Sequence, residues 1–221
     1  MTGSKQKKKA NKKWSANLAY AIGLFASDGS ISKDGRHLDM SSNGIEQLEN
    51  SMECVGIKNT IGVKKSGNSE NICRRVQFGD VSFCEFLFEI GLTSAKSKTI
   101  GKLKIPKKYF FDFLRGSFDG DGCFYSYYDL RWKSSFMYYT TFISASREHI
   151  DWIREEIFDR LRISGHITHS KAATVYQLKY AKKDSFQILR SMYNGSKVIC
   201  LSRKRQKVEK ALNVEGKSLP I

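Results

Sequence analysis

Two stretches of similar character, about 93 residues apart (121 − 28 for their shared aspartate), constrain the fold of this 221-residue chain more than any other feature. They run over residues 21–29 and 114–122. Each places small residues four positions apart and ends in Asp-Gly. Small side chains at that spacing form a smooth stripe along a helix, which lets two helix backbones approach closely. We therefore expect two helices packed together, each opening one half of the chain.

The order of elements after each stretch also repeats. Apolar periodicity and turn residues in the first half predict helix, hairpin, helix, hairpin and helix over residues 17–28, 30–40, 45–55, 60–78 and 82–90. The second half predicts the same order over residues 110–121, 123–143, 149–161, 166–180 and 184–193, followed by a helix over 204–212. A duplication this long fits a pseudo-symmetric α+β pair better than a solenoid. The predicted divisions are a disordered basic arm, an N-terminal half, a linker and a C-terminal half, over 1–13, 14–92, 93–108 and 109–221.

The charge balance indicates a polyanionic partner. The chain has 38 lysines and arginines against 22 acids, a net charge of +16. Six lysines and no acid lie in the first thirteen residues, which leaves +10 (16 − 6) on the remainder. Nucleic acid is the first candidate for such a surface, and a merely solvated basic surface is the alternative. A membrane is not favoured, because no run of roughly 18 apolar residues, no secretory segment and no strongly amphipathic basic helix occurs.

The cysteines and histidines argue against a zinc or disulfide scaffold. The five cysteines are odd in number and form no C-x-x-C pair, which favours a reducing, intracellular compartment. His166 and His169 form H-x-x-H, but they lie in a predicted strand without a partnering cysteine pair, so we expect no metal site there.

The aspartates that end the two motif helices predict a cation site. Asp28 and Asp121 stand where the negative end of the helix dipole disfavours a carboxylate. If the small-residue stripes pack together, the two carboxylates also lie close to each other, and like charges raise a pKa unless a cation intervenes. Hard oxygen ligands of this kind suit Mg²⁺. The alternative is that both aspartates are solvated turn residues.

The two motifs resemble those of the LAGLIDADG homing endonucleases, whose last motif aspartate falls on Asp28 and Asp121. The resemblance covers the chain from Trp14 to about Leu212, because hairpins and helices follow in the family's order. It implies a pseudo-symmetric monomer of two LAGLIDADG halves, each with a saddle-shaped antiparallel sheet that lies in the major groove of DNA. The first motif departs from the family at Ala26 and Ser27. In the second, Arg115 replaces a small residue, and nothing in the sequence explains it.

The resemblance also implies the roles of individual residues. The motif aspartates, with the carbonyl groups of Ser27 and Gly120, would hold Mg²⁺ near the two scissile phosphates. A basic residue after the second hairpin of each half assists the chemistry in this family. Lys96 takes that place in the first half, and Lys204, with Arg203 as its rival, takes it in the second. The alternative is that these basic residues only touch phosphates.

Strand alternation predicts which side chains read DNA. In residues 60–65, Ile61 and Val63 are expected to point inward and Lys64 outward. Outward arginine and glutamine side chains can form paired hydrogen bonds with guanine and adenine edges. Each such residue is alternatively a solvated strand position. The side chains expected to contact DNA are Ser32, Arg36, Lys64, Arg75, Gln77, Tyr125, Tyr127, Arg131, Lys133, Gln177 and Lys179.

The sequence thus predicts a homing endonuclease that makes a metal-dependent double-strand break in duplex DNA. We expect a monomer that needs no protein partner, in the cytoplasm of a bacterium or archaeon or in a mitochondrion or chloroplast. One alternative is an intron-encoded RNA splicing cofactor (maturase), because Tyr125, Tyr127 and Tyr138 offer aromatic surface. The other is a non-cleaving DNA-binding protein of the same fold. The presence of both Asp28 and Asp121 argues against it.

Overall fold

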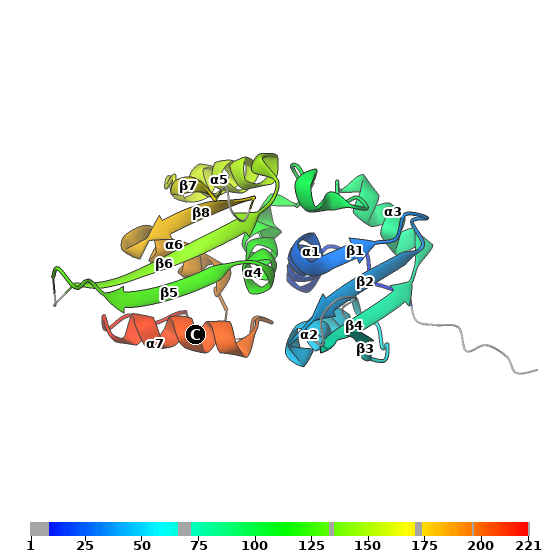
Figure 1. Cartoon of the computed structure of the whole chain (residues 1–221), viewed down its shortest axis with the longest axis horizontal. Coiled ribbons are helices and arrows are strands. Elements are labelled where there is room, and N and C mark those ends of the chain that lie inside the picture. The colour runs from blue at the N-terminus through cyan, green and yellow to red at the C-terminus, as the bar shows by residue number, and fades with distance from the viewer. Residues whose placement is uncertain (1–8, 66–71, 133–134, 171–173, 196, 221) are drawn as a thin grey trace, which may run out of the picture.

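The computed structural model describes residues 9–65, 72–132, 135–170, 174–195 and 197–220. Two four-stranded antiparallel sheets flank a central pair of helices, α1 and α4, and the remaining helices pack around the sheets (Figure 1). The predicted α+β fold with two corresponding halves is therefore confirmed. Residues 66–71, within the hairpin predicted over 60–78, and the predicted contact residue Lys133 lie outside the described residues.

Both halves repeat one order of elements. The first half contains α1 (Ala16–Asp28), β1 (Gly29–Ile31), β2 (His37–Ser42), α2 (Ile45–Val55), β3 (Gly62–Lys65), β4 (Ile72–Gly79) and α3 (Val81–Glu89). After two short 3-10 helices, η1 (Lys96–Lys98) and η2 (Lys107–Tyr109), the second contains α4 (Phe110–Gly120), β5 (Cys123–Tyr128), β6 (Phe136–Ser144), α5 (Arg147–Leu161), β7 (His166–Ser170), β8 (Val175–Ala181), α6 (Lys182–Met192) and α7 (Ser202–Asn213). The strand orders β1-β2-β4-β3 and β5-β6-β8-β7 are equivalent, so each sheet places the strand after the motif helix at one edge.

The small-residue stripes of α1 and α4 meet backbone to backbone. A Cβ added to Gly23 would lie 2.1 Å from the carbonyl oxygen of Phe113. A Cβ added to Gly116 would lie 2.0 Å from that of Tyr20. Both distances are far below van der Waals contact, so only glycine allows this approach. The predicted close packing of the two motif helices is confirmed, and it brings their C-terminal ends together.

The segment before α1 differs from its prediction. The arm over residues 1–13 is predicted to be disordered, but its last residues lie on the first half. Ala10 N donates to Asp80 Oδ2 at 2.9 Å, and Asn11 N donates to the Val55 carbonyl at 2.8 Å. The side chain of Ala10 is buried. Hydrogen bonds from the backbone and the buried side chain of Ala10 therefore hold this segment in place, although its lysine-rich composition predicts a solvated chain.

The linker between the halves is also packed. Ile100 and Leu103 are buried, and two residues near the start of α5 bond its backbone. Ser146 Oγ donates to the Ile100 carbonyl at 2.5 Å, and His149 Nδ1 lies 2.8 Å from the Gly101 carbonyl. These contacts join the linker to the second half and carry η1, with Lys96, toward the ends of the motif helices.

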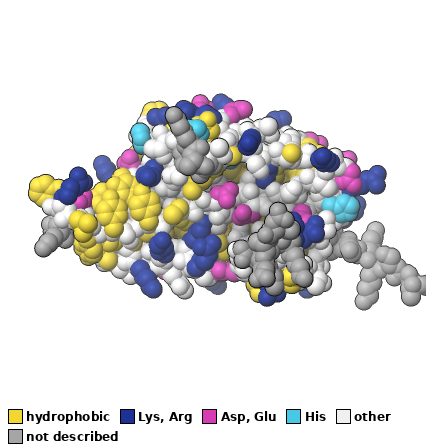
Figure 2. Space-filling view, in the orientation of Figure 1, with side chains coloured by type: hydrophobic (Ala, Val, Ile, Leu, Met, Phe, Trp, Pro, Cys, Tyr) yellow, Lys and Arg dark blue, Asp and Glu magenta, His cyan; other side chains and the backbone are white. Residues whose placement is uncertain are grey.

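The face of the molecule drawn in Figure 2 carries charge on both halves and a large apolar region. Lysine and arginine side chains are spread over this face, and a hydrophobic patch lies over the second-half sheet. Among the described residues, no helix combines the length and apolar character needed to cross a membrane.

Candidate functional site

The C-terminal ends of α1 and α4 form a shared acidic site. Gly120, next to Asp121, lies so close to the other helix that an added Cβ would be 2.4 Å from Ser27 Cβ and 3.0 Å from Asp28 Oδ2. Asp28 is half-buried, and Asp121 stays open to solvent on one side. The two predicted acids therefore meet across the junction of the halves.

Electrostatics at this junction disfavour two bare carboxylates. Burial raises the pKa of Asp28, and the negative charge of Asp121 raises it further. Partial withdrawal from water also raises the pKa of Asp121, while the positive charges of Lys96 and Lys204 lower it. Proximity of like charges, which the sequence predicts for this pair, is thus present.

Two buried lysines reach the ends of the motif helices. Lys96 Nζ donates to the Gly29 carbonyl at 2.6 Å. Lys204 Nζ donates to the carbonyls of Phe118 and Gly122, the latter at 2.7 Å. Cations are favourable at a helix C-terminus, so these lysines offset the dipole that opposes the aspartates. Burial lowers the pKa of both amines, that of Lys204 to about 8.

This geometry separates the rival basic residues of the second half. Lys204 is only 9% exposed and turns into the junction. Its neighbour Arg203 is exposed. Of the two candidates, Lys204 is therefore the one whose amine reaches the end of α4, as that of Lys96 reaches the end of α1.

The oxygen atoms at the junction fit a hard divalent cation. Within the described parts of the chain, no group of three or more His, Cys, Asp and Glu side chains is placed to hold a metal. Two carboxylates and nearby carbonyls are the available donors, which suits Mg²⁺ with water or phosphate completing its shell. The Gly120 carbonyl accepts from Lys204 Nζ at 3.2 Å and has a second lone pair. A cavity of about 180 Å³ beside Ser27 and Asp121 is large enough for several water molecules.

Gln47 of α2 is a site residue that the sequence analysis does not identify. It is 5% exposed, and its Nε2 donates to Asp28 Oδ2 at 2.5 Å. The third residue of α5, His149, corresponds to it in the second half but bonds the linker carbonyl of Gly101. The two half-sites are therefore not equivalent. A glutamine on the buried side of an amphipathic helix is the only sequence signal, and it does not point to Asp28.

Comparisons with known proteins agree on the architecture. No protein-family model matches the chain, and no curated protein matches it in sequence. The N-terminal LAGLIDADG domain of DUF199/WhiA matches with 18% identity and a TM-score of 0.53, over 88% of each chain. The I-LtrWI LAGLIDADG homing endonuclease bound to target DNA matches with 12% identity and a TM-score of 0.61, over 90% of this chain and 89% of that one. The meganuclease I-SmaMI bound to uncleavable DNA matches with 14% identity and a TM-score of 0.59, over 91% and 92%.

The chain has the LAGLIDADG fold. Its LAGLIDADG helices are α1 and α4, and Asp28 and Asp121 stand at their ends. At identities of 12–18% the likeness defines the fold and not the activity.

Arg115, unexplained in the sequence, ties the second LAGLIDADG helix to the segment that follows α6. The Arg115 side chain is 2% exposed. Its Nε donates to the Ile199 carbonyl at 2.9 Å, and its Nη1 donates to the Met192 carbonyl at 2.5 Å. Its Nη2 pairs with Asp112 Oδ1 at 3.0 Å, and the group also lies over the ring of Tyr20. A small residue at this position could make none of these bonds.

Asp119, one turn along α4, holds the same segment nearer to α7. Its Oδ2 accepts from Tyr20 Oη at 2.8 Å and from Leu201 N at 2.7 Å. Burial raises the pKa of this carboxyl, and the two hydrogen bonds oppose that shift. Leu201 immediately precedes α7, which carries Lys204, so Asp119 and Arg115 together fix where that lysine enters the site.

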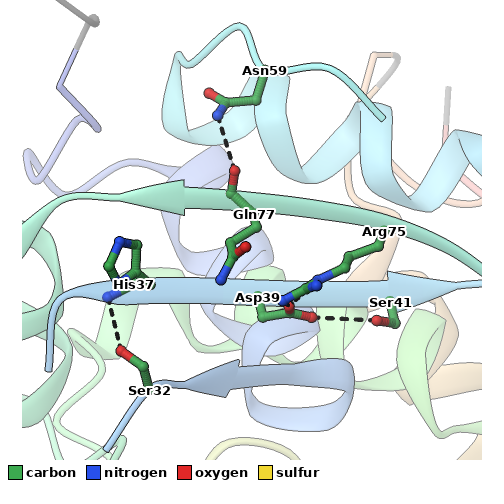
Figure 3. A network of polar contacts seen from close by, with 7 residues as sticks. All are labelled: Ser32, His37, Asp39, Ser41, Asn59, Arg75 and Gln77. Atoms are coloured by element: carbon green, nitrogen blue, oxygen red, sulfur yellow. Dashed lines mark hydrogen bonds and ion pairs between the residues drawn. The ribbon is translucent and has the colours of Figure 1, made fainter. Parts of the chain in front are cut away.

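The outer face of the first LAGLIDADG sheet is polar (Figure 3). The register pairs Asp39 of β2 with Gln77 of β4, and Ser41 with Arg75, so these side chains share one face. Asp39, which the sequence analysis misses, binds the guanidinium of Arg75. Asn59 Nδ2 donates to the Gln77 carbonyl at 3.0 Å. Arg75 and Gln77 therefore face outward as predicted, with Arg75 held by an acid.

The other predicted contacts of the first half lie at the rim of this sheet. Lys64 is exposed on the edge strand β3, and the turn between β1 and β2 carries Arg36 and Ser32, whose Oγ accepts from His37 N at 2.9 Å. Val63, predicted to be buried, is 60% exposed. Alternation places it on the core side, but an edge strand extends past the helices that would cover it.

The outer face of the second sheet is aromatic. Tyr125 and Tyr127 of β5 lie on it as predicted, together with Tyr139 of β6. Tyr138, the third tyrosine considered for RNA contact, is instead buried in the core. Alternation explains the difference, because adjacent residues of β6 face opposite sides. In Figure 2 the hydrophobic patch covers the region of β5 and β6.

The remaining predicted contacts of the second half lie on or beside this aromatic face. Gln177 and Lys179 of β8 face outward, and Lys179 Nζ lies 5.7 Å from the centre of the Tyr125 ring. Arg131, near the β5–β6 turn, donates two side-chain hydrogen bonds to Asp129. The outward set therefore runs from the junction to the end of the β5–β6 hairpin.

Proposed function

We propose that this protein is a site-specific endonuclease that binds duplex DNA along both sheets and makes a double-strand break with a divalent cation. The observation that carries this proposal is the paired site at the ends of the LAGLIDADG helices. Each half contributes one carboxylate and one buried lysine, Asp28 with Lys96 and Asp121 with Lys204. Two such sets match the two strands of a duplex.

Structural neighbours support the choice of substrate and cofactor. Structures of I-LtrWI and I-SmaMI contain DNA, one of I-DmoI contains DNA and Mn, and one of I-SmaMI contains DNA and calcium ions. The net charge of +16 on this chain suits a phosphate backbone. Outward side chains on both sheets, such as Arg75 and Gln177, would reach base edges from the major groove.

The chain's own residues position the reacting groups. Asp28 and Asp121, with the carbonyls of Ser27 and Gly120, would hold Mg²⁺. That ion would supply Lewis-acid activation of water and stabilise the departing 3′ oxygen. Lys96 and Lys204 place positive charge where a phosphate gains negative charge in the transition state. The role of Gln47 is to orient the Asp28 carboxylate through its hydrogen bond.

A second candidate function has one observation in its favour. Tyr125, Tyr127 and Tyr139 form an aromatic surface of the kind that can stack on RNA bases, as an RNA splicing cofactor would require. The paired acids have no part in that role. We therefore place it second, together with DNA binding without cleavage.

Incubation with a randomised duplex library and Mg²⁺ tests the proposal. We expect sequencing of the products to show cuts on both strands within one preferred sequence, and EDTA to prevent them. Specific binding without cuts would instead identify a non-cleaving DNA-binding protein. Binding to structured or single-stranded RNA alone would identify the splicing role.

A further inference from the structure

The outer faces of the two sheets differ in chemistry although their topology is the same. The first presents hydrogen-bonding groups, among them Asp39, Arg75 and Gln77. The corresponding region of the second presents three tyrosine rings, with two more apolar side chains on the same face of β6. These five residues, here called the tyrosine face, are Tyr125, Tyr127, Met137, Tyr139 and Ile143.

The three tyrosine rings of the tyrosine face pack against one another. The centres of the Tyr125 and Tyr139 rings are 5.1 Å apart, and their planes differ by 16°. Tyr127 lies 6.4 Å from Tyr125 and 6.2 Å from Tyr139, with both angles at 8°. Parallel rings at these separations contact one another. The tyrosine face is thus a preorganised, largely apolar aromatic surface whose polar atoms are the three tyrosine hydroxyl groups, with Lys179 beside it.

The major groove offers few groups that can contact such a surface favourably. Base edges there are donors and acceptors, apart from the C5-methyl group of thymine. A donor or acceptor covered by an apolar surface loses its hydrogen bonds to water without replacement. A methyl group gains from the same contact.

We infer that the tyrosine face recognises a thymine-rich segment of the second half-site through the thymine methyl groups. This inference rests on the proposed function, because it requires the sheet to lie in the major groove. It adds a division of labour: the first sheet and β8 of the second read hydrogen-bonding edges, and the tyrosine face on β5 and β6 reads methyl groups.

The ring geometry favours methyl contact over stacking on unpaired bases. A base that stacks between two side chains needs their faces to be free. The Tyr125 and Tyr139 rings are stacked with centres 5.1 Å apart, which leaves no gap between them for a base to enter. Methyl groups need only the outer surface of the cluster.

Replacement of thymine by uracil tests this inference, since it removes the methyl group and keeps every hydrogen-bonding group. The probe is the duplex selected from the randomised library, with uracil placed in one half-site at a time. We expect each methyl lost under the tyrosine face to weaken binding about fourfold, as one buried methyl group should. Uracil in the first half-site should change binding little.

Two neighbouring residues provide a matched pair of variants. Tyr127 is 44% exposed on the tyrosine face, and Tyr128 is 55% exposed on the opposite face of the same strand. Tyr127→Ser should reduce the penalty for uracil in the second half-site. Tyr128→Ser should leave that penalty unchanged.

The outcomes separate this inference from the proposed function. A selected duplex whose second half-site tolerates uracil overturns the inference and leaves site-specific binding intact. If no duplex is selected, the proposed function and the inference fall together. Tyr127-dependent binding of single-stranded RNA or DNA would then identify a stacking surface.

Discussion

Asp28 and Asp121 lie at helix C-terminal ends, where the helix dipole disfavours a carboxylate. The positive charges of Lys96 and Lys204 compensate for that cost. The same arrangement leaves both carboxyls with raised pKa values, because neither is fully solvated. Residues placed against their own electrostatic preference are typical of functional sites. Their removal is therefore expected to affect chemistry more than folding.

Asp28→Asn and Asp121→Asn should each lower double-strand cleavage by roughly a thousandfold, since loss of a metal ligand removes several kcal/mol of transition-state stabilisation. Both variants should still bind the selected duplex in a gel-shift assay and unfold at or above the parent temperature, because a like-charge contact is relieved. Asp129→Asn, at the far hairpin, is the control. Undiminished cleavage by either junction variant would remove that aspartate from the site.

Arg115→Met should destabilise the protein by about 3 kcal/mol, because the carbonyls of Met192 and Ile199 lose their donors and Asp112 loses its partner. Arg147→Met breaks an exposed pair with Asp151 and should cost less than about 1 kcal/mol. Urea denaturation of the two variants measures the difference. Equal losses would mean that the buried guanidinium does not hold the segment before α7.

At the scale of elements, contact between α1 and α4 sets the geometry of the site. Gly116→Ala should cost about 3 kcal/mol and reduce cleavage, because the added methyl group meets the Tyr20 carbonyl and forces the helices apart. Gly44→Ala, whose Cβ would have its nearest neighbour 3.9 Å away, is the control. Denaturation and cleavage measured on both variants test this, and a tolerant Gly116 would contradict the close approach.

The contact of α5 with the linker should make stability depend on pH. Burial lowers the pKa of His149 from its ordinary 6.5 to about 4. Between these values the unfolded chain binds a proton that the folded chain does not, so this residue's contribution is present above pH 6.5 and is lost as the pH falls toward 4. The full loss is about 3 kcal/mol.

His149→Gln should therefore flatten the decline of unfolding free energy between pH 6.5 and 4, measured by denaturant titration. His166→Gln, at an exposed strand position, should leave the decline unchanged. A decline of the same steepness in all three proteins would show that His149 is not buried in its neutral form.

The elements were predictable to the extent that their signals are local. The small residues of α1 and α4 predicted the contact between these helices, and turn residues predicted where most helices and strands end. Gln47 against Asp28, and Arg115 against Ile199, join residues far apart in sequence, so no local pattern contained them. Val63 shows a third case, in which alternation gave the correct face of a strand but not whether a helix covers it.

At the scale of the whole molecule, both LAGLIDADG helices belong to one chain, and each buries its small-residue stripe against the other. We therefore expect a monomer of 25.2 kDa in solution without DNA. Light scattering at micromolar concentration measures the mass. A value near twice that figure would mean that the halves pair between chains.

The glycine contact between α1 and α4 fixes the distance between the two halves and leaves the outward side chains of the sheets free to vary. Backbone atoms, and not the side chains of either sheet, set the spacing of the two acids. If the protein cleaves DNA as proposed, each sheet can change its outward residues, and with them the preferred sequence, without altering the offset between the two cuts. A chimera that joins this first half to another LAGLIDADG second half must therefore keep Gly23 and have a glycine at the position of Gly116, so that the two helices can approach as closely.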